Sequence, residues 1–192
     1  VVLYAHVMDW ELAGSAVKRF KGLTRFVVKI AARWLYKKCT RIIAASSKSA
    51  DMIGSIGVDT PKTVIPLGID TQRFKPSDKN VAKKKLGLQG KRVIGFVGRL
   101  AHEKDLPTLY AAFKEAQKKV PNMKLLIVGT GITNILPEDD DVRLAGPQTD
   151  IVPYLQAMDL FVLPSLTETN SLATMEAMSC ALPVIVTPVG SI

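Results

Sequence analysis

Short apolar runs alternate with amphipathic segments along the second half of the chain. The apolar runs have the length of strands and occupy residues 92–97, 124–128, 142–145, 160–163 and 183–187. The segments between them have helical spacing and cover 106–120, 151–158 and 171–181. Strands that are continuously apolar and separated by helices belong to parallel sheets covered on both faces. This alternation predicts an α/β fold.

The first half has fewer such runs. Strands are expected at 1–5, 41–47 and 63–67, with a short helix between the last two that ends near residue 56. The polar segment 70–91 contains a Lys83–Lys85 run and is interpreted as a linker. The sequence therefore predicts one unit over 1–69 and another over 92–192.

Charge divides the chain in the same way. Residues 1–91 carry 18 Lys and Arg against 6 Asp and Glu, whereas residues 92–192 carry 8 against 11. Such asymmetry indicates two units with different partners.

No apolar run is long enough to span a bilayer. The chain starts at Val1 inside a strand-like run and ends after another, so we interpret it as a fragment of a longer protein.

Cys39 and Cys180 lie far apart in the sequence without the spacing of metal ligands. We interpret both as reduced thiols of a cytoplasmic protein.

A basic helix is expected near residues 18–41. Between residues 12 and 50 there are ten Lys and Arg and no acidic residue. Apolar residues recur at helical spacing, namely Phe20, Leu23, Val27, Ile30, Ala31 and Trp34, and a cationic row comprises Arg25, Lys29, Arg33 and Lys37. Either the apolar residues pack on the sheet under a solvated basic face, or the helix contacts an anionic membrane surface. Nucleic acid is disfavoured, because no aromatic-interleaved recognition motif is present.

Two carboxylates, Glu168 and Glu176, lie eight residues apart in the strand–turn–helix–strand stretch 161–190. In open α/β sheets, ligands bind where helices begin above the carboxyl ends of strands. Backbone N–H groups from Thr169 to Ser171 would face a bound anion. Glu176 could accept hydrogen bonds from ribose hydroxyls, with Glu168 nearer the reacting group. Alternatively, both acids merely suit the helix dipole.

The turn after residue 97 offers cations for a diphosphate. Gly98 permits close backbone approach, and Arg99 and Lys104 supply positive charge, although chance could place them there equally well. The Gly129–Gly131 turn is an incomplete dinucleotide fingerprint, because Asn134 stands where a third glycine would be. We interpret it as a tight turn beside the ligand. The acidic run 138–141 is expected to be a solvated loop rather than a metal site.

Together these motifs resemble a known family. GRLAHEKD, VGTG, the E-x7-E pair and PVIVTPVG are similar to the C-terminal domain of GT-B glycosyltransferases, specifically the retaining glycosyltransferase family 4 (group 1). VVLYAH, RIIAASSKSADMI and VIPLGIDTQRFKP resemble the same family's first domain, in the same order. The resemblance implies two Rossmann-like parallel-sheet domains. The N-terminal acceptor domain would be incomplete, and the C-terminal nucleotide-sugar domain truncated.

The resemblance also implies a role for each matching residue. The donor diphosphate would lie against Gly98, Arg99 and Lys104, and the ribose against Glu176. The backbone of Asn170, Ser171 and Leu172 would help to hold phosphate and sugar. Glu168 would contact the donor sugar, and His6 would line the cleft beside it, which makes these two the expected catalytic residues.

The implied activity is that of a hexosyltransferase (EC 2.4) in polysaccharide or glycolipid biosynthesis. It would move a sugar from a nucleotide-sugar to a glycan or lipid-linked acceptor with retention of configuration, and without a divalent metal or other cofactor. The enzyme would be cytoplasmic or peripheral at the inner face of the membrane, and this fragment would be inactive alone.

The chain departs from the family pattern at a few positions. Asp105 replaces the usual glycine after Glu-Lys, and Glu168-Thr169-Asn170-Ser171 replaces E-G-F-G. The altered loop keeps open a degenerate transferase or a nucleotide-binding module without catalysis. A GT-B nucleotide-sugar epimerase is the other alternative. A Rossmann dehydrogenase is disfavoured by the incomplete glycine pattern.

Overall fold

The computed structural model describes residues 1–5, 21–132, 134 and 136–190. Every strand pairing in it is parallel, which confirms the predicted α/β class. The chain divides into two compact units. The first comprises Val1–Gly68 with Thr167–Ser171 and Pro188–Ile192, and the second comprises Ile69–Leu166 with Leu172–Thr187.

The first unit is built on a three-stranded sheet. Its strands are β1 (Val2–Ala5), β2 (Arg41–Ala44) and β3 (Lys62–Val64), in that order. Helix α2 (Lys21–Lys37) precedes β2, and α3 (Ser47–Ser55) begins where the Ser46 hydroxyl accepts a hydrogen bond from the Ser49 N–H at 3.1 Å. The core of this unit comprises Ala5, Ala32, Tyr36, Cys39, Ile42, Ile53 and Val58.

Helix α2 buries a different face from the one expected. Leu23, Val27, Ile30 and Trp34 are 53–62% exposed, whereas Ala32 and Tyr36 are buried against the sheet. Of the two alternatives for this helix, the one in which Leu23, Val27, Ile30 and Trp34 pack on the sheet was therefore wrong. The helix carries two apolar stripes, and periodicity alone cannot say which of them meets the core. The basic residues Lys29, Arg33 and Lys37 lie between the two stripes on the helix surface.

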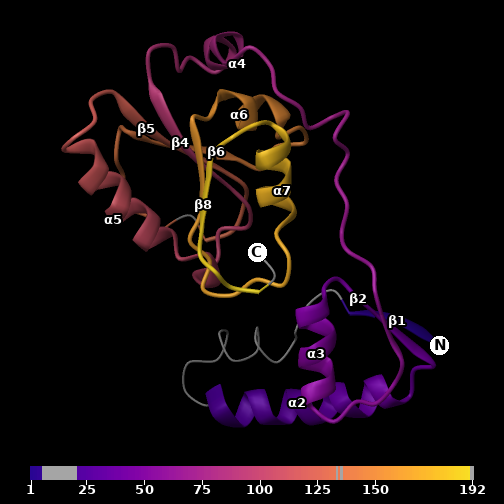
Figure 1. Ribbon diagram of the computed structural model, residues 1–192. Coiled ribbons are helices and arrows are strands. Elements are labelled where there is room, and N and C mark those ends of the chain that lie inside the picture. The colour runs from indigo at the N-terminus through magenta and orange to yellow at the C-terminus, as the bar shows by residue number, and fades with distance from the viewer. Residues whose placement is uncertain (6–20, 133, 135, 191–192) are drawn as a thin grey trace. The chain divides into compact units, whose positions relative to one another are not determined.

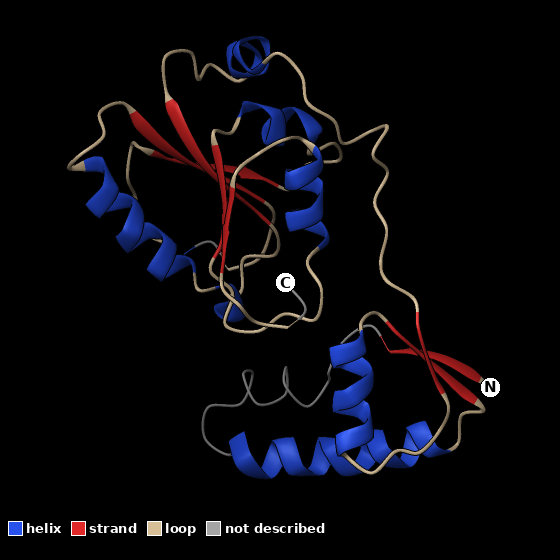
Figure 2. Cartoon of the chain, in the orientation of Figure 1, coloured by secondary structure: helices blue, strands red, loops and turns tan. Residues whose placement is uncertain are grey.

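The second unit has a five-stranded parallel sheet in the order β6-β5-β4-β7-β8. The strands are β4 (Arg92–Val97), β5 (Met123–Val128), β6 (Val142–Gly146), β7 (Leu160–Leu163) and β8 (Val184–Val186). The helices are α4 (Lys79–Lys85), the 3₁₀ turn η1 (His102–Lys104), α5 (Leu106–Gln117), α6 (Val152–Ala157) and α7 (Leu172–Ser179). Figures 1 and 2 show α5 on one face of this sheet and α6 and α7 on the other.

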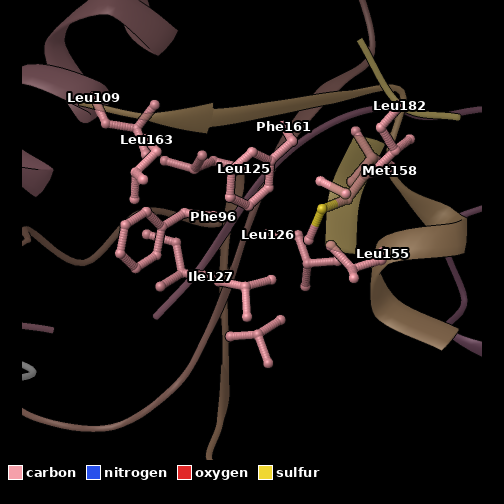
Figure 3. Close-up of a cluster of buried hydrophobic side chains, with 14 of the residues drawn as sticks. Phe96, Leu109, Leu125, Leu126, Ile127, Leu155, Met158, Phe161, Leu163 and Leu182 are labelled. Carbon is pink, nitrogen blue, oxygen red and sulfur yellow. The ribbon is translucent and has the colours of Figure 1, made fainter. Parts of the chain in front are cut away.

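Large apolar side chains fill the space between sheet and helices (Figure 3). Phe96, Leu125, Leu126, Leu155, Met158 and Phe161 are all fully buried. Because the strands carry apolar residues on both faces, each face can bury a helix, which explains their continuous hydrophobic runs.

Residues 70–91, expected to be a linker, carry helix α4 and pack into the second unit. The Lys83 ammonium is 2.6 Å from the Asp159 carboxylate, which also accepts a hydrogen bond from the Val93 N–H at 2.8 Å. Burial tends to raise the pKa of Asp159, but hydrogen bonds from Lys83, Val93 and Lys79 outweigh it and lower that pKa overall. The ion pair therefore fastens α4 to the start of β4.

The acidic run 138–141 is not simply a solvated loop. The Asp139 carboxylate is 12% exposed and accepts hydrogen bonds from Lys114 at 2.8 Å and from the Tyr110 hydroxyl at 2.9 Å. Asp141 pairs with Lys124 at 2.7 Å. The expectation of free solvation was wrong for Asp139, because helix α5 presents a cation and a hydroxyl to it.

Within the described ranges, no helix is both long and apolar enough to cross a bilayer. Cys39 and Cys180 are buried free thiols, as expected from their spacing.

Candidate functional site

The strand order of the second unit reverses at β4. From β4 the chain moves outward on one side to β5 and β6, then returns to form β7 on the other side of β4. Such a reversal opens a crevice at the carboxyl ends of the two central strands, where ligands bind in open α/β sheets. Gly98 and Arg99 follow β4 at this edge, and Ser165 and Leu166 follow β7.

The backbone around Arg99 is fixed by the Gly129–Gly131 turn. The Gly98 N–H donates to the Val128 carbonyl at 3.0 Å, and the Leu100 N–H donates to the Thr130 carbonyl at 2.8 Å. A Cβ on Gly129 would lie 1.8 Å from the Gly98 oxygen. A Cβ on Gly131 would lie 2.2 Å from the Leu100 oxygen. The two glycines therefore let the turn pack closely against residues 98–100. This close approach explains the spacing of the glycines.

Glu103 engages the arginine directly. Its side chain, 12% exposed, forms an ion pair with the Arg99 guanidinium, which is 64% exposed. The Glu103 carbonyl accepts a hydrogen bond from the Leu166 N–H at 2.8 Å. The turn η1 thus joins the segments that follow β4 and β7.

Lys104 is the last residue of η1 and is half-buried. It lies five residues after Arg99 on the same connection. The next residue, Asp105, has φ 47° and ψ 47°, the left-handed conformation that glycine adopts most readily. The backbone here has the form that the family's usual glycine would favour, and aspartate tolerates it better than most residues.

Glu176 lies in the second turn of α7 and is half-buried. Burial raises the pKa of Glu176 above its ordinary value, and the nearby Arg73 charge acts in the opposite direction. Near the end of the same helix, the Ser179 hydroxyl donates to the Phe74 carbonyl at 2.5 Å. Leu172, the first residue of α7, is 38% exposed.

Glu168, Asn170 and Ser171 belong to the first unit. Within that unit, Gly190 lies against the backbone of Glu168, because a Cβ on Gly190 would be 2.0 Å from the Glu168 oxygen. Gly190 also has φ +64°, so the glycine of PVIVTPVG is required on both counts. Ser171 is buried and Glu168 half-buried.

The expected site residues therefore fall into three groups. The second unit holds Gly98, Arg99, Lys104, Leu172 and Glu176, and the first holds Glu168, Asn170 and Ser171. His6 lies outside the described residues. Glu103 was not foreseen, although its position four residues after Arg99 is a spacing at which charges meet on a helical turn.

Over the described part of the chain, no cluster of three or more His, Cys, Asp or Glu side chains could hold a metal ion. Arg99 and Lys104 supply cations after β4, and Glu176 supplies a carboxylate in the second turn of α7, the helix that follows β7. Such a set suits an anionic ligand that also carries hydroxyl groups.

Two family models together cover nearly the whole chain. Residues 91–192 match the glycosyl transferases group 1, and residues 1–73 match glycosyltransferase family 4. This chain belongs to the group 1, family 4 glycosyltransferases. That confirms the resemblance inferred from the sequence motifs.

Curated relatives of the chain are also named glycosyltransferases. The lipopolysaccharide core biosynthesis mannosyltransferase LpsB of Rhizobium meliloti is 30% identical over 83% of this chain and 48% of its own length. The UDP-Gal:alpha-D-GlcNAc-diphosphoundecaprenol alpha-1,3-galactosyltransferase of Escherichia coli is 37% identical over 87% of this chain and 48% of its own. The chain thus spans about half the length of these relatives.

Solved structures show the same fold. Anabaena Alr3699/HepE, in complex with UDP and glucose, has a TM-score of 0.79 at 21% identity, over 98% of this chain and 53% of its own. WaaG, a glycosyltransferase of lipopolysaccharide biosynthesis, has a TM-score of 0.77 at 19% identity, over 98% and 56%. These likenesses confirm the predicted GT-B type of α/β fold.

Proposed function

We propose that the protein transfers a sugar from a nucleotide-sugar donor to a glycan or lipid-linked acceptor. The observation that carries this proposal is the pair Arg99 and Lys104 on the connection that leaves β4, at the reversal of strand order. Membership of the family supports it. So do the names of relatives, one of which acts with UDP-Gal on a diphosphoundecaprenol-linked sugar.

In this proposal each residue of the donor site has a physical task. The guanidinium of Arg99 and the ammonium of Lys104 bind the diphosphate, and they stabilise the charge that grows on it as it leaves. Two cations can do this without a divalent ion or other cofactor, so none is included. The Glu176 carboxylate accepts hydrogen bonds from the ribose hydroxyls. Gly98 leaves room for the phosphates beside the backbone.

The remaining assigned residues act at the sugar. Glu168 contacts the donor sugar, and His6, which lies outside the described residues, is the second residue assigned to catalysis. The backbone from Asn170 to Leu172 contacts phosphate and sugar. The bond between the anomeric carbon and the diphosphate oxygen breaks, and the acceptor oxygen bonds to that carbon on the same face. The acceptor's proton moves to the leaving phosphate, and the configuration is retained.

An assay of sugar transfer with the full-length protein tests the proposal. Arg99→Ala should lower turnover by about 10²-fold or more, as removal of one charge-stabilising group does elsewhere. Arg92→Ala is the matched control, because Arg92 is an exposed arginine at the opposite end of the same strand. Unchanged turnover in Arg99→Ala would show that this edge of the sheet does not bind the donor.

The E-T-N-S loop keeps a second candidate function in view, a nucleotide-binding module without catalysis. Glu168→Gln separates the two candidates, because it removes the carboxylate assigned to the donor sugar and keeps the shape of the side chain. A transferase should lose product formation in this variant while it still binds nucleotide. If product formation is the same as in the unaltered protein, the role assigned to Glu168 is wrong.

We also propose that α2 contacts an anionic membrane surface at the cytoplasmic face. The exposed stripe of Leu23, Val27, Ile30 and Trp34 lies opposite the buried face of the helix. Val27, Ile30, Ala31 and Trp34 give the middle of this stripe an open, almost entirely apolar surface. An apolar stripe of this kind would insert at the boundary between headgroups and acyl chains.

Cations flank the stripe on both sides. Lys29, Arg33 and Lys37 follow one edge, and on the other the Lys38 ammonium lies 3.6 Å from the centre of the Trp34 ring. Helix α2 contains no acidic residue. Each basic residue near an anionic bilayer contributes about 1 kcal/mol, so four of them would matter. Nucleic acid is not proposed as a partner.

Sedimentation of the protein with vesicles tests this contact. We expect binding to vesicles that contain phosphatidylserine, weaker binding to phosphatidylcholine alone, and a decrease as salt screens the charges. Lys29→Gln with Arg33→Gln and Lys37→Gln should abolish the preference. Lys84→Gln with Lys85→Gln, which alters exposed lysines of α4, should leave it unchanged. Equal binding to both kinds of vesicle would contradict the proposal.

A further inference from the structure

The Arg99–Glu103 ion pair lies within the proposed donor site, yet no donor role has been assigned to Glu103. We infer that Glu103 is a positioning residue: it orients the Arg99 guanidinium for the donor diphosphate before the donor binds. The inference rests on the role proposed for Arg99. It adds a residue whose effect on the donor is indirect, through the arginine.

The first support is that the backbone on both sides of Arg99 is anchored. Hydrogen bonds from Gly98 to Val128 and from Leu100 to Thr130 extend the sheet ladder past the end of β4. The backbone of Arg99 therefore has little freedom. The position of its charge depends on the rotamer of the long side chain. An exposed arginine loses much rotamer freedom when a ligand fixes it.

The second support is that Glu103 is itself held. Its carboxylate is largely buried, and its carbonyl accepts the Leu166 N–H. Within η1, the Lys104 N–H donates to the Ala101 carbonyl at 3.0 Å. A fixed carboxylate can orient a mobile guanidinium, whereas two mobile partners would orient each other poorly.

The third support is the geometry of the contact. The ion pair engages Nη2 of Arg99, and a guanidinium has five N–H donors, so others remain to reach a phosphate. Glu103 can thus hold one edge of the group while another edge faces the ligand. The hydrogen bond from the Leu166 N–H to the Glu103 carbonyl ties Glu103 to the segment that follows β7.

A double-mutant cycle on nucleoside diphosphate binding tests the inference. Binding of UDP, GDP and ADP to the full-length protein would be measured by calorimetry, and the tightest of the three would be the probe. Glu103→Ala should weaken binding roughly fivefold, a coupling typical of residues in one ion-pair network. Glu103→Gln keeps an oxygen that can accept the guanidinium hydrogen bond, so it should restore part of the loss.

The decisive comparison is made in the Arg99→Ala background, where Glu103→Ala should have no further effect. Glu115→Ala is the control for the loss of an exposed ion pair remote from the site, because Glu115 of α5 pairs with Lys118 and both side chains are exposed. Thermal unfolding should show that both variants remain folded, because the backbone link from Leu166 to Glu103 survives the substitution.

Each failure has a distinct meaning. If Arg99→Ala weakens binding but Glu103→Ala binds as well as the unaltered protein or more tightly, the inference is overturned and the donor site is not. The inference is likewise overturned if Glu103→Ala weakens binding equally in both backgrounds. If Arg99→Ala binds normally, the proposed donor site is wrong and the inference falls with it.

Discussion

Single carboxylates in this chain differ according to what surrounds them. Glu176 is half-buried, and burial raises its pKa although the Arg73 charge acts in the opposite direction. Asp139 accepts hydrogen bonds from Lys114, from the Asp141 N–H and from Tyr110, and its pKa falls to about 2 from an ordinary 3.8. The first carboxylate is kept at a cost to stability, which is the pattern expected of a residue that serves a ligand. The second contributes to the fold.

We predict that Glu176→Gln stabilises the protein at neutral pH while it weakens donor binding. A carboxyl whose pKa is raised in the folded state binds protons more tightly than in the unfolded state. Ionisation therefore lowers stability as the pH rises from the unfolded pKa through the folded one. Glutamine has no such penalty, so its advantage in thermal unfolding should be present at pH 7 and absent near pH 4. An unchanged affinity for nucleoside diphosphate-sugar would argue against the ribose role.

We predict the opposite pH dependence for Asp139→Asn. The lowered pKa of Asp139 adds stability above pH 4, and this stability is lost as the pH falls through about 2. The variant should therefore unfold more easily at pH 7, with a difference that shrinks below pH 4. Urea unfolding at several pH values measures it, and Asp140→Asn, in an exposed neighbour, is the control. A difference that is constant with pH would contradict the assigned cause.

At the scale of elements, the bounds of the helices and strands in the second unit were predictable, whereas the contacts between elements were not. The helix expected at 106–120 is Leu106–Gln117, and the strand expected at 142–145 is Val142–Gly146. Continuous apolar runs and helical spacing are local signals, so they survive folding. Contacts between elements depend on partners far along the chain. The buried stripe of α2 and the Lys83–Asp159 ion pair that anchors α4 are two examples.

Helix α2 gives a direct test of its reassigned faces. Ala32→Asn should destabilise the chain by about 2 kcal/mol or more, because it places an amide in the core of the first unit. Ile30→Asn, two residues away on the exposed stripe, should change the free energy of unfolding by less than about 0.5 kcal/mol. Denaturant unfolding provides both values. Equal losses would mean that the stripe of Ile30 is covered in the protein.

The Gly129–Gly131 turn, which follows β5 and packs against the backbone around Arg99, gives a second test at this scale. Gly131→Ala should cost more than about 1 kcal/mol, because its φ of +142° disfavours alanine and the added Cβ meets the Leu100 carbonyl. Gly90→Ala is the control, since Gly90 also has a positive φ of +67° but nothing lies near its Cβ. Nucleotide binding should fall in the first variant only, because only that substitution displaces the backbone that holds Arg99.

For the whole molecule, the sequence motifs were sufficient to predict the fold type and the family. Their order along the chain carried that prediction, since each alone is common. The candidate donor-site residues remain predictions. Gly98 and Arg99 could be placed at one edge of the sheet because they directly follow β4, where the strand order reverses. Glu103 was missed because its role depends on a three-dimensional contact with Arg99 and on a backbone link to the next connection.

The proposed donor site requires that the edge of the sheet beyond β4 binds the diphosphate of a nucleotide-sugar. Thermal unfolding of the full-length protein with a panel of nucleotide-sugars, in the presence of EDTA, tests it most directly. A donor at 100 times its Kd should add about 2.7 kcal/mol to stability. We expect at least one donor to give this stabilisation in the unaltered protein and in Arg92→Ala, and none to give it in Arg99→Ala. Stabilisation that persists in Arg99→Ala, or that no donor produces, would contradict the claim.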